Sequence, residues 1–199
     1  MKIQAVIFDL DGTLTEPFLD FDQIRREMGV PREGVCILEA LSAMSETERR
    51  KAEAVLVAHE ATAAEQSTLN DGASCVLDVL REKGIPVGVL TRNSRTNAIF
   101  VAQKHGLRFD AMICREDGPA KPDGFGVFAL CRRFNADPKQ TLVVGDFKHD
   151  LESARNAGAI AVLLKTHAKA DSFANLADRV IMRLDELLRI IDELENTEL

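Results

Sequence analysis

Short runs of branched and aromatic apolar residues, each followed by polar residues, recur along this chain of 199 residues. They occupy residues 2–8, 85–90, 111–114, 141–144 and 160–164. Helical patterns lie between them, at residues 74–83, 95–105, 125–134 and 150–157. An edge strand at residues 179–182 and a helix from about residue 184 complete the pattern. This alternation predicts a Rossmann-like α/β fold, in which helices cover both faces of a parallel sheet.

Residues 16–70 interrupt the alternation. They contain no convincing strand pattern and are rich in Ala, Glu, Leu and Met at helical spacing. A helical insertion after the first strand is most simply a small cap over the loops of the sheet, with hinges near Pro17 and at residues 70–72. We therefore expect a core domain of residues 1–15 and 71–199 with a helical cap of residues 16–70. The alternative is a helical extension that only adds to the core.

Charge and hydropathy patterning exclude several classes of function. The chain carries 25 Lys and Arg against 32 Asp and Glu, and its formal net charge of −7 opposes a nucleic-acid-binding surface, which needs clustered positive charge. The first apolar run is too short for a signal peptide, and no run of about 18 apolar residues predicts a membrane span. We expect a cytoplasmic protein without nucleic-acid or membrane partners, as a monomer or a homodimer.

The cysteines do not predict a metal or redox site. They stand far apart in apolar segments and form no CxxC pair, at Cys36, Cys75, Cys114 and Cys131. We therefore expect buried, reduced thiols. Cys114 precedes Arg115, but a single basic neighbour is weak support for a catalytic thiolate.

Polar residues gather where the predicted strands end, or in the loops that follow them. These residues are Asp9, Asp11, Thr91, Lys121, Asp146 and Asp150. Because the carboxyl ends of parallel strands share one edge of a sheet, we expect these side chains to surround a single pocket. Each motif alone has a structural explanation, as a turn, a solvated loop or a helix cap. Their joint placement at strand ends favours a catalytic site.

The four motifs, in their order along the chain, resemble those of the haloacid dehalogenase superfamily, and within it the phosphoglycolate-phosphatase-like subgroup with a helical cap. They are DLDGT at residue 9, LT at residue 90, KP at residue 121 and GDxxxD at residue 145. The resemblance spans residues 3–164. It implies a magnesium-dependent phosphatase that hydrolyses a small phosphate monoester through an aspartyl-phosphate intermediate.

The resemblance also implies a role for each matching residue. Asp9 would be the nucleophile, and Asp11 the general acid and base that serves the leaving group and then the attacking water. Thr91 and Lys121 would stabilise the phosphoryl oxygens. The implied ligands of Mg²⁺ are Asp9, the main-chain carbonyl of Asp11 and Asp146, with Asp150 in support.

Other residues near these motifs are weaker candidates. We expect the backbone amides of Leu10, Arg92 and Asn93 to help bind the phosphoryl group. For Arg92, Arg95 and His149, substrate contact and simple exposure to solvent both remain open. The arginines of the insertion are expected to face solvent, at Arg25, Arg26, Arg49 and Arg50. The GxGxxA pattern of residues 124–129 follows no strand, so it does not predict a dinucleotide site.

Alternatives from other classes remain. A signalling receiver domain also combines Asp, Thr and Lys on a parallel sheet, but its phosphorylated Asp follows a middle strand and it has no helical insertion. The core motifs do not exclude a phosphotransferase or phosphomutase, which would pass the phosphoryl group to another acceptor. A non-catalytic binding protein is the third alternative. No motif in the insertion identifies the phosphate ester.

Overall fold

The computed structural model describes residues 1–30 and 36–196. The chain divides into two compact units, a core unit of Met1–Pro17 and Thr68–Leu199 and a helical unit of Phe18–Ser67. The helical unit contains α1 (Phe21–Met28), α2 (Ile37–Ala43) and α3 (Glu46–Gln66). Residues 70–72, expected as a hinge, lie inside the core unit, and the chain leaves that unit after Pro17.

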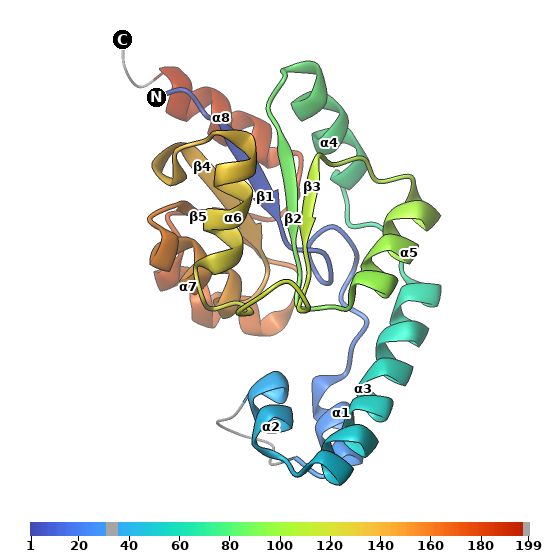
Figure 1. The fold of residues 1–199 in the computed structure, drawn as a ribbon. Helices are drawn as coiled ribbons and strands as arrows, with labels where there is room; N and C mark the ends of the chain where they lie inside the picture. Colours follow the sequence, from blue (N-terminus) through green and yellow to red (C-terminus); the bar gives the residue numbers. More distant parts are fainter. Residues whose placement is uncertain (31–35, 197–199) are drawn as a thin grey trace. The chain divides into compact units, whose positions relative to one another are not determined.

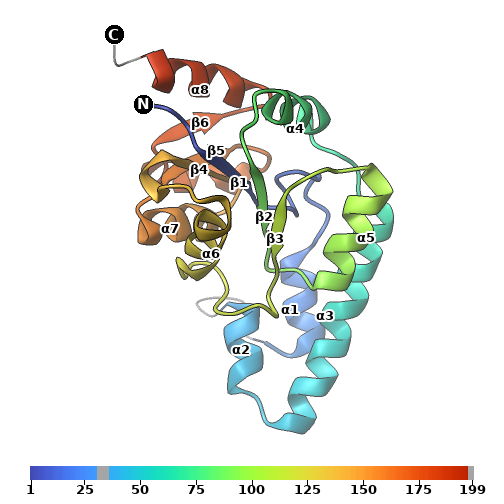
Figure 2. The same cartoon turned by 45° about the horizontal axis from the view of Figure 1, so that its top comes forward.

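The core unit is built on a six-stranded sheet. Its strands are β1 (Ala5–Phe8), β2 (Val87–Leu90), β3 (Ala111–Ile113), β4 (Thr141–Gly145), β5 (Ile160–Leu164) and β6 (Arg179–Ile181). They are parallel throughout and follow the order β3-β2-β1-β4-β5-β6, so that β1 and β4 are central (Figures 1 and 2). The predicted α/β fold with a parallel sheet is confirmed.

Helices cover both faces of this sheet, which explains why its central strands are apolar along their whole length. The helices of the core unit are α4 (Ala73–Glu82), α5 (Arg95–His105), α6 (Phe125–Phe134), α7 (Lys148–Ala157) and α8 (Glu186–Asn196). Figure 2 shows α6 and α7 on one face and α4 and α8 on the other. All four residues of β1 are fully buried between these layers. Short 3₁₀ helices, η1 (Pro138–Gln140) and η2 (Ala168–Leu176), precede β4 and β6.

The cysteines depart in one case from the sequence expectation. Cys114 and Cys131 are buried and Cys36 is half-buried, but Cys75 is exposed. The buried stripe of α4 is formed by Ala73, Val76 and the leucines that follow, so position 75 lies on the outward face. The expectation that all four thiols are buried was therefore wrong for Cys75.

The helices in the described part of the chain include none that is both long enough and apolar enough to span a membrane.

Candidate active site

The predicted site residues follow the strands of the core unit at one edge of the sheet. Asp9 comes directly after β1, Thr91 after β2 and Asp146 after β4. Lys121 lies between β3 and α6, and Asp150 lies in the first turn of α7. The parallel arrangement of the strands thus brings together residues that are distant in the sequence.

Lys121 joins these segments. Its buried ammonium group donates hydrogen bonds to Asp9 Oδ1 at 2.5 Å, to Asp150 Oδ1 at 2.5 Å and to the carbonyl oxygen of Leu90 at 2.8 Å. Burial alone would lower the pKa of Lys121, but the carboxylates of Asp150 and Asp9 outweigh it and raise the pKa above its ordinary value. Lys121 therefore places a fixed positive charge beside Asp9.

Three buried carboxylates form a compact cluster of oxygen atoms. Asp9, Asp146 and Asp150 each offer one oxygen within 4.8 Å of the others. Burial raises the pKa of Asp9 well above its ordinary value, although Lys121 opposes the shift, and burial also raises the pKa of Asp146. An all-oxygen set of negative groups that repel one another fits a small, hard divalent cation such as Mg²⁺.

Asp150 differs from the other two members of this cluster because both of its oxygens already have partners. Oδ1 accepts from Lys121, and Oδ2 accepts the backbone N–H of Phe147 at 3.0 Å. The second bond closes the first turn of α7. Asp150 therefore holds Lys121 and the start of α7 in place, an arrangement suited to support rather than to direct ligation.

Asp11 belongs to a second hydrogen-bonded group. Its Oδ2 accepts from the side-chain amide of Asn93 at 3.0 Å, and the backbone N–H of Asn93 donates to Thr91 Oγ1 at 3.0 Å. Burial raises the pKa of Asp11, and the hydrogen bond from Asn93 partly opposes this shift. The sequence predicted Asn93 for its backbone amide; the structure adds a side-chain contact with Asp11.

Two glycines allow the loops to approach each other this closely. Gly12 has a φ of +95°, and a Cβ atom on it would overlap the carboxylate of Asp146. A Cβ atom on Gly145 would overlap Asp150. The glycines of the two motifs are therefore required by the proximity of the acidic side chains.

The sequence did not single out His167 and Thr13, which also contact Asp146. His167 Nε2 donates to the backbone oxygen of Asp146 at 3.0 Å and lies 3.3 Å from its Oδ2. The contact with the Asp146 carboxylate is the main cause that raises the pKa of His167 above its ordinary value. Thr13 Oγ1 donates to Asp146 Oδ1 at 3.3 Å. Both contacts orient the Asp146 carboxylate.

The weaker candidates have varied surroundings. Leu10 has a buried side chain, and Arg92 is half-buried. Arg95 forms an ion pair with Asp117. His149 packs against Phe147 with a ring-centroid distance of 5.3 Å, and its Nδ1 lies 3.3 Å from Glu152 Oε2. In the helical unit, Arg49 and Arg50 both pair with Glu46.

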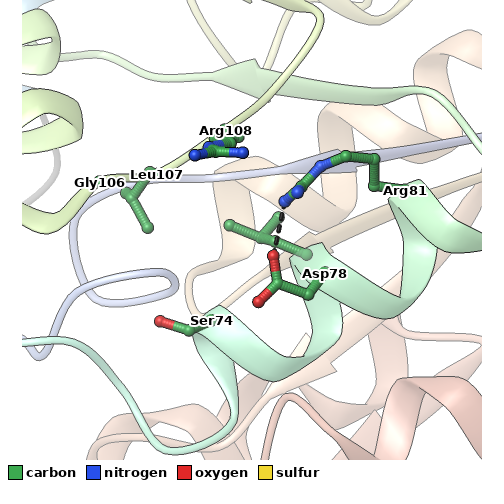
Figure 3. A pocket seen from close by; sticks show the side chains of 7 residues that line it. Ser74, Asp78, Arg81, Gly106, Leu107 and Arg108 are labelled. Atoms are coloured by element: carbon green, nitrogen blue, oxygen red, sulfur yellow. Dashed lines mark hydrogen bonds and ion pairs between the residues drawn. The ribbon is translucent and has the colours of Figure 1, made fainter.

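A cleft of about 300 Å³ lies elsewhere on the core unit, between α4 and the segment that follows α5 (Figure 3). Its lining residues are Ser74, Leu77, Asp78, Arg81, Gly106, Leu107 and Arg108. Arg81 pairs with Asp78 at 2.5 Å within the cleft. None of the predicted site residues lines it, so the cleft is separate from the carboxylate cluster.

Comparison with known proteins identifies the family. A family model described as haloacid dehalogenase-like hydrolase matches residues 19–158, more than half of the chain. The chain belongs to this hydrolase family. The matched range includes Thr91, Lys121 and Asp146, whereas Asp9 and Asp11 precede it. The resemblance inferred from the motifs is confirmed.

Relatives of this hydrolase cover nearly its full length. An uncharacterized hydrolase of Saccharomyces cerevisiae is 29% identical over 98% of this chain and 92% of its own. A phosphoglycolate phosphatase of Chromobacterium violaceum is 26% identical over 93% of this chain and 95% of its own. The crystal structure of a hydrolase from Pseudomonas syringae has a TM-score of 0.82 at 21% identity, covering 96% of this chain and 99% of its own. That structure shares the fold.

Proposed function

We propose that this hydrolase is a magnesium-dependent phosphatase that cleaves a small phosphate monoester through a phosphorylated Asp9. The observation that carries the proposal is the Lys121 ammonium group between Asp9 and Asp150, beside the three-carboxylate cluster. A carboxylate nucleophile, a fixed cation and a set of hard oxygen ligands are the groups that transfer of a phosphoryl dianion requires. The relative from Chromobacterium violaceum, named for a small phosphate ester, supports this substrate class.

In the first step, an Asp9 oxygen attacks phosphorus while the bond from phosphorus to the ester oxygen breaks. The departing alkoxide takes a proton from Asp11. Burial supports this assignment because it raises the pKa of Asp11 and so keeps its carboxyl group protonated at a higher pH than that of a free Asp. The hydrogen bond from Asn93 holds the group in place.

In the second step, water attacks the phosphorus of the Asp9 acyl phosphate. Asp11, now ionised, accepts a proton from this water, and the bond from phosphorus to Asp9 breaks to release inorganic phosphate. The same carboxyl group therefore acts first as an acid and then as a base. Asp9 returns to its starting state.

The remaining groups would stabilise the negative charge of the phosphoryl group and of the nucleophile. Lys121 and the hydroxyl of Thr91 stabilise the phosphoryl oxygens in the transition state. Asp9, Asp146 and the main-chain carbonyl of Asp11 would hold Mg²⁺, supported by Asp150. When bound, this ion supplies positive charge that reduces repulsion between the Asp9 carboxylate and an anionic substrate.

The test is phosphate release from a panel of small phosphate esters in the presence of MgCl₂. We expect Asp9→Asn to lower kcat by at least about 10⁴-fold and Asp11→Asn to lower it by about 10²–10⁴-fold. The matched control is Asp78→Asn, the same chemical change at an exposed position on α4. EDTA should abolish turnover, and excess MgCl₂ should restore it.

Each result bears on a specific part of the proposal. Turnover by Asp9→Asn close to the wild-type rate would contradict the nucleophile assignment, and metal-free turnover would contradict the magnesium assignment. Exchange of the phosphoryl group between esters without release of inorganic phosphate would instead identify a phosphotransferase or phosphomutase.

A further inference from the structure

The side chain of Asn70 is bonded to the loop that follows β1. Its Nδ2 atom donates to the backbone oxygens of Gly12 at 3.1 Å, Thr13 at 2.8 Å and Thr15 at 2.8 Å. An amide nitrogen carries two hydrogens, so three acceptors at these distances require one hydrogen to be shared. One short side chain thus gathers three peptide groups of the loop.

The loop also forms bonds of its own that make it a compact turn. Gly12 N–H donates to Thr15 O at 3.0 Å, and Thr15 N–H donates to Leu10 O at 2.9 Å. The hydroxyl of Thr15 donates to the same Leu10 oxygen at 3.2 Å. Asn70 therefore contacts a turn whose shape is already restricted, and its amide fixes the orientation of the peptide groups immediately after Asp11.

Asn70 is itself anchored by its backbone. Its N–H donates to Leu14 O at 3.0 Å, and its carbonyl oxygen accepts from Ala73 N–H at 3.1 Å at the start of α4. Next to it, Glu16 N–H donates to Thr68 O at 2.9 Å. The chain thus leaves and re-enters the core unit as two paired segments, and Asn70 projects from the returning segment into the loop.

Two side chains with proposed roles, Asp11 and Asp146, depend on this loop. Asp11 directly precedes the three peptide groups that Asn70 binds. Asp146 accepts a hydrogen bond from the hydroxyl of Thr13, which lies within the loop. A change in the orientation of these peptide groups would move the Asp11 carboxyl group relative to Asn93, its hydrogen-bond donor. A displacement of about 1 Å at a catalytic group is enough to reduce a rate by about 100-fold.

We propose that Asn70 is a positioning residue that holds Asp11 where it can protonate the leaving group. The inference rests on the proposed phosphatase function and deepens it. Asn70 acts through the backbone of residues 12–15, to which its side-chain amide is hydrogen-bonded. Its amide group is necessary because a carboxylate of the same shape would place negative oxygens against three carbonyl oxygens.

The leaving group provides the test. In an alkyl phosphate the departing alkoxide needs a proton, whereas in p-nitrophenyl phosphate the stable p-nitrophenolate leaves without one. Because the second step is the same for both esters, the comparison uses kcat/KM, which reports the first step. A displaced Asp11 therefore lowers kcat/KM far more for the alkyl ester than for the aryl ester. A general loss of folded protein would lower both rates by the same factor.

The experiment measures kcat/KM on both substrates, with the melting temperature, for the wild type, Asn70→Asp, Asn70→Ser and Asp11→Asn. We expect Asn70→Asp to lose about 100-fold on the alkyl ester and only a small part of that on the aryl ester. Asn70→Ser, which keeps one donor, should show a smaller difference of the same sign. Asn175→Asp, the same change at an exposed residue of η2, should alter neither rate.

Equal losses on the two esters, in either folded variant of Asn70, would overturn the proposal. If Asn70→Asp does not fold, the ratio of the two rates in Asn70→Ser decides in the same way. Failure of the proposed function would appear differently, because Asp9→Asn would stay active or Asp11→Asn would show no dependence on the leaving group. A leaving-group effect in Asp11→Asn without one in the Asn70 variants rejects this inference alone.

Discussion

Gly12 illustrates how a single backbone angle supports the site. Its φ of +95° is strained for any residue with a side chain, and a Cβ atom would displace the Asp146 carboxylate. We expect Gly12→Ala to destabilise the protein by about 1–3 kcal/mol and also to lower kcat sharply. Gly84→Ala is the control, because Gly84 has a φ of +68° but nothing within 4 Å of its Cβ position.

Thermal unfolding and phosphate release measured on both glycine variants separate the two effects. Both substitutions introduce backbone strain, so both should lower the melting temperature. Only Gly12→Ala should lose activity in the folded protein. An active Gly12→Ala enzyme would show that the close packing of Gly12 on Asp146 is not needed for catalysis.

The cysteines differ in their expected reactivity. Cys75 is exposed on α4, whereas burial raises the pKa of Cys114 to about 11 and leaves its side chain enclosed. We expect Cys75→Ser to remove one thiol from the fast phase of reaction with a disulfide reagent at neutral pH. Cys114→Ser should leave that phase unchanged. Loss of a fast-reacting thiol in Cys114→Ser would contradict this view of its environment.

Single residues also show where prediction from the sequence stops. Residues that directly follow a strand in a recognisable motif, such as Asp9 and Asp146, could be named because the motif fixes both their type and their place. Asn70 and His167 could not be named, because they bind backbone oxygens that are distant in the sequence. Every residue has a backbone carbonyl, so the residue types do not show which carbonyl is bound. Only the fold reveals such partners.

At the scale of elements, the apolar runs predicted the strands well because burial on both faces gives each strand a continuous apolar sequence. The boundaries of the helices were harder to predict. α7 begins at Lys148, two residues earlier than expected, because Asp150 accepts the N–H of Phe147 and closes the first turn. The 3₁₀ segment η2 has no strong periodicity and was not predicted.

The cleft between α4 and the segment after α5 is an alternative location for the active site, and a substitution in its lining distinguishes it from the carboxylate cluster. Arg81 and Arg108 both line it, and Arg81 is already paired with Asp78 (Figure 3). We expect Arg108→Ala to leave kcat and KM for phosphate esters within about 2-fold of wild type, as for most exposed positions away from a site. A large rise in KM would show that the cleft takes part in substrate binding.

At the scale of the whole molecule, the site places stability and function in opposition. Asp9, Asp11 and Asp146 all have raised pKa values, and burial is the largest cause in each case. A carboxyl group whose pKa is higher in the folded than in the unfolded state opposes folding when ionised, increasingly as the pH rises above its ordinary value. The ionised forms of these buried carboxyl groups therefore lower the free energy of unfolding of the metal-free protein.

This opposition predicts the effect of Asp146→Asn on melting. The substitution removes one buried negative charge, so the metal-free variant should melt at a temperature equal to or above that of the metal-free wild type. For the wild type, MgCl₂ at 100 times its Kd should contribute about 2.7 kcal/mol. That contribution corresponds to a rise of about 5–10 °C for a chain of this size.

The variant should lose this rise, because Asp146 is one of the three clustered carboxylates. Asp78→Asn, an exposed substitution, should keep it. Differential scanning calorimetry with and without MgCl₂ measures both quantities on the same samples, independently of activity. If MgCl₂ raises the melting temperature of Asp146→Asn as much as that of the wild type, the cation binds elsewhere. If the metal-free variant melts well below the metal-free wild type, Asp146 stabilises the fold through its contacts with Thr13 and His167.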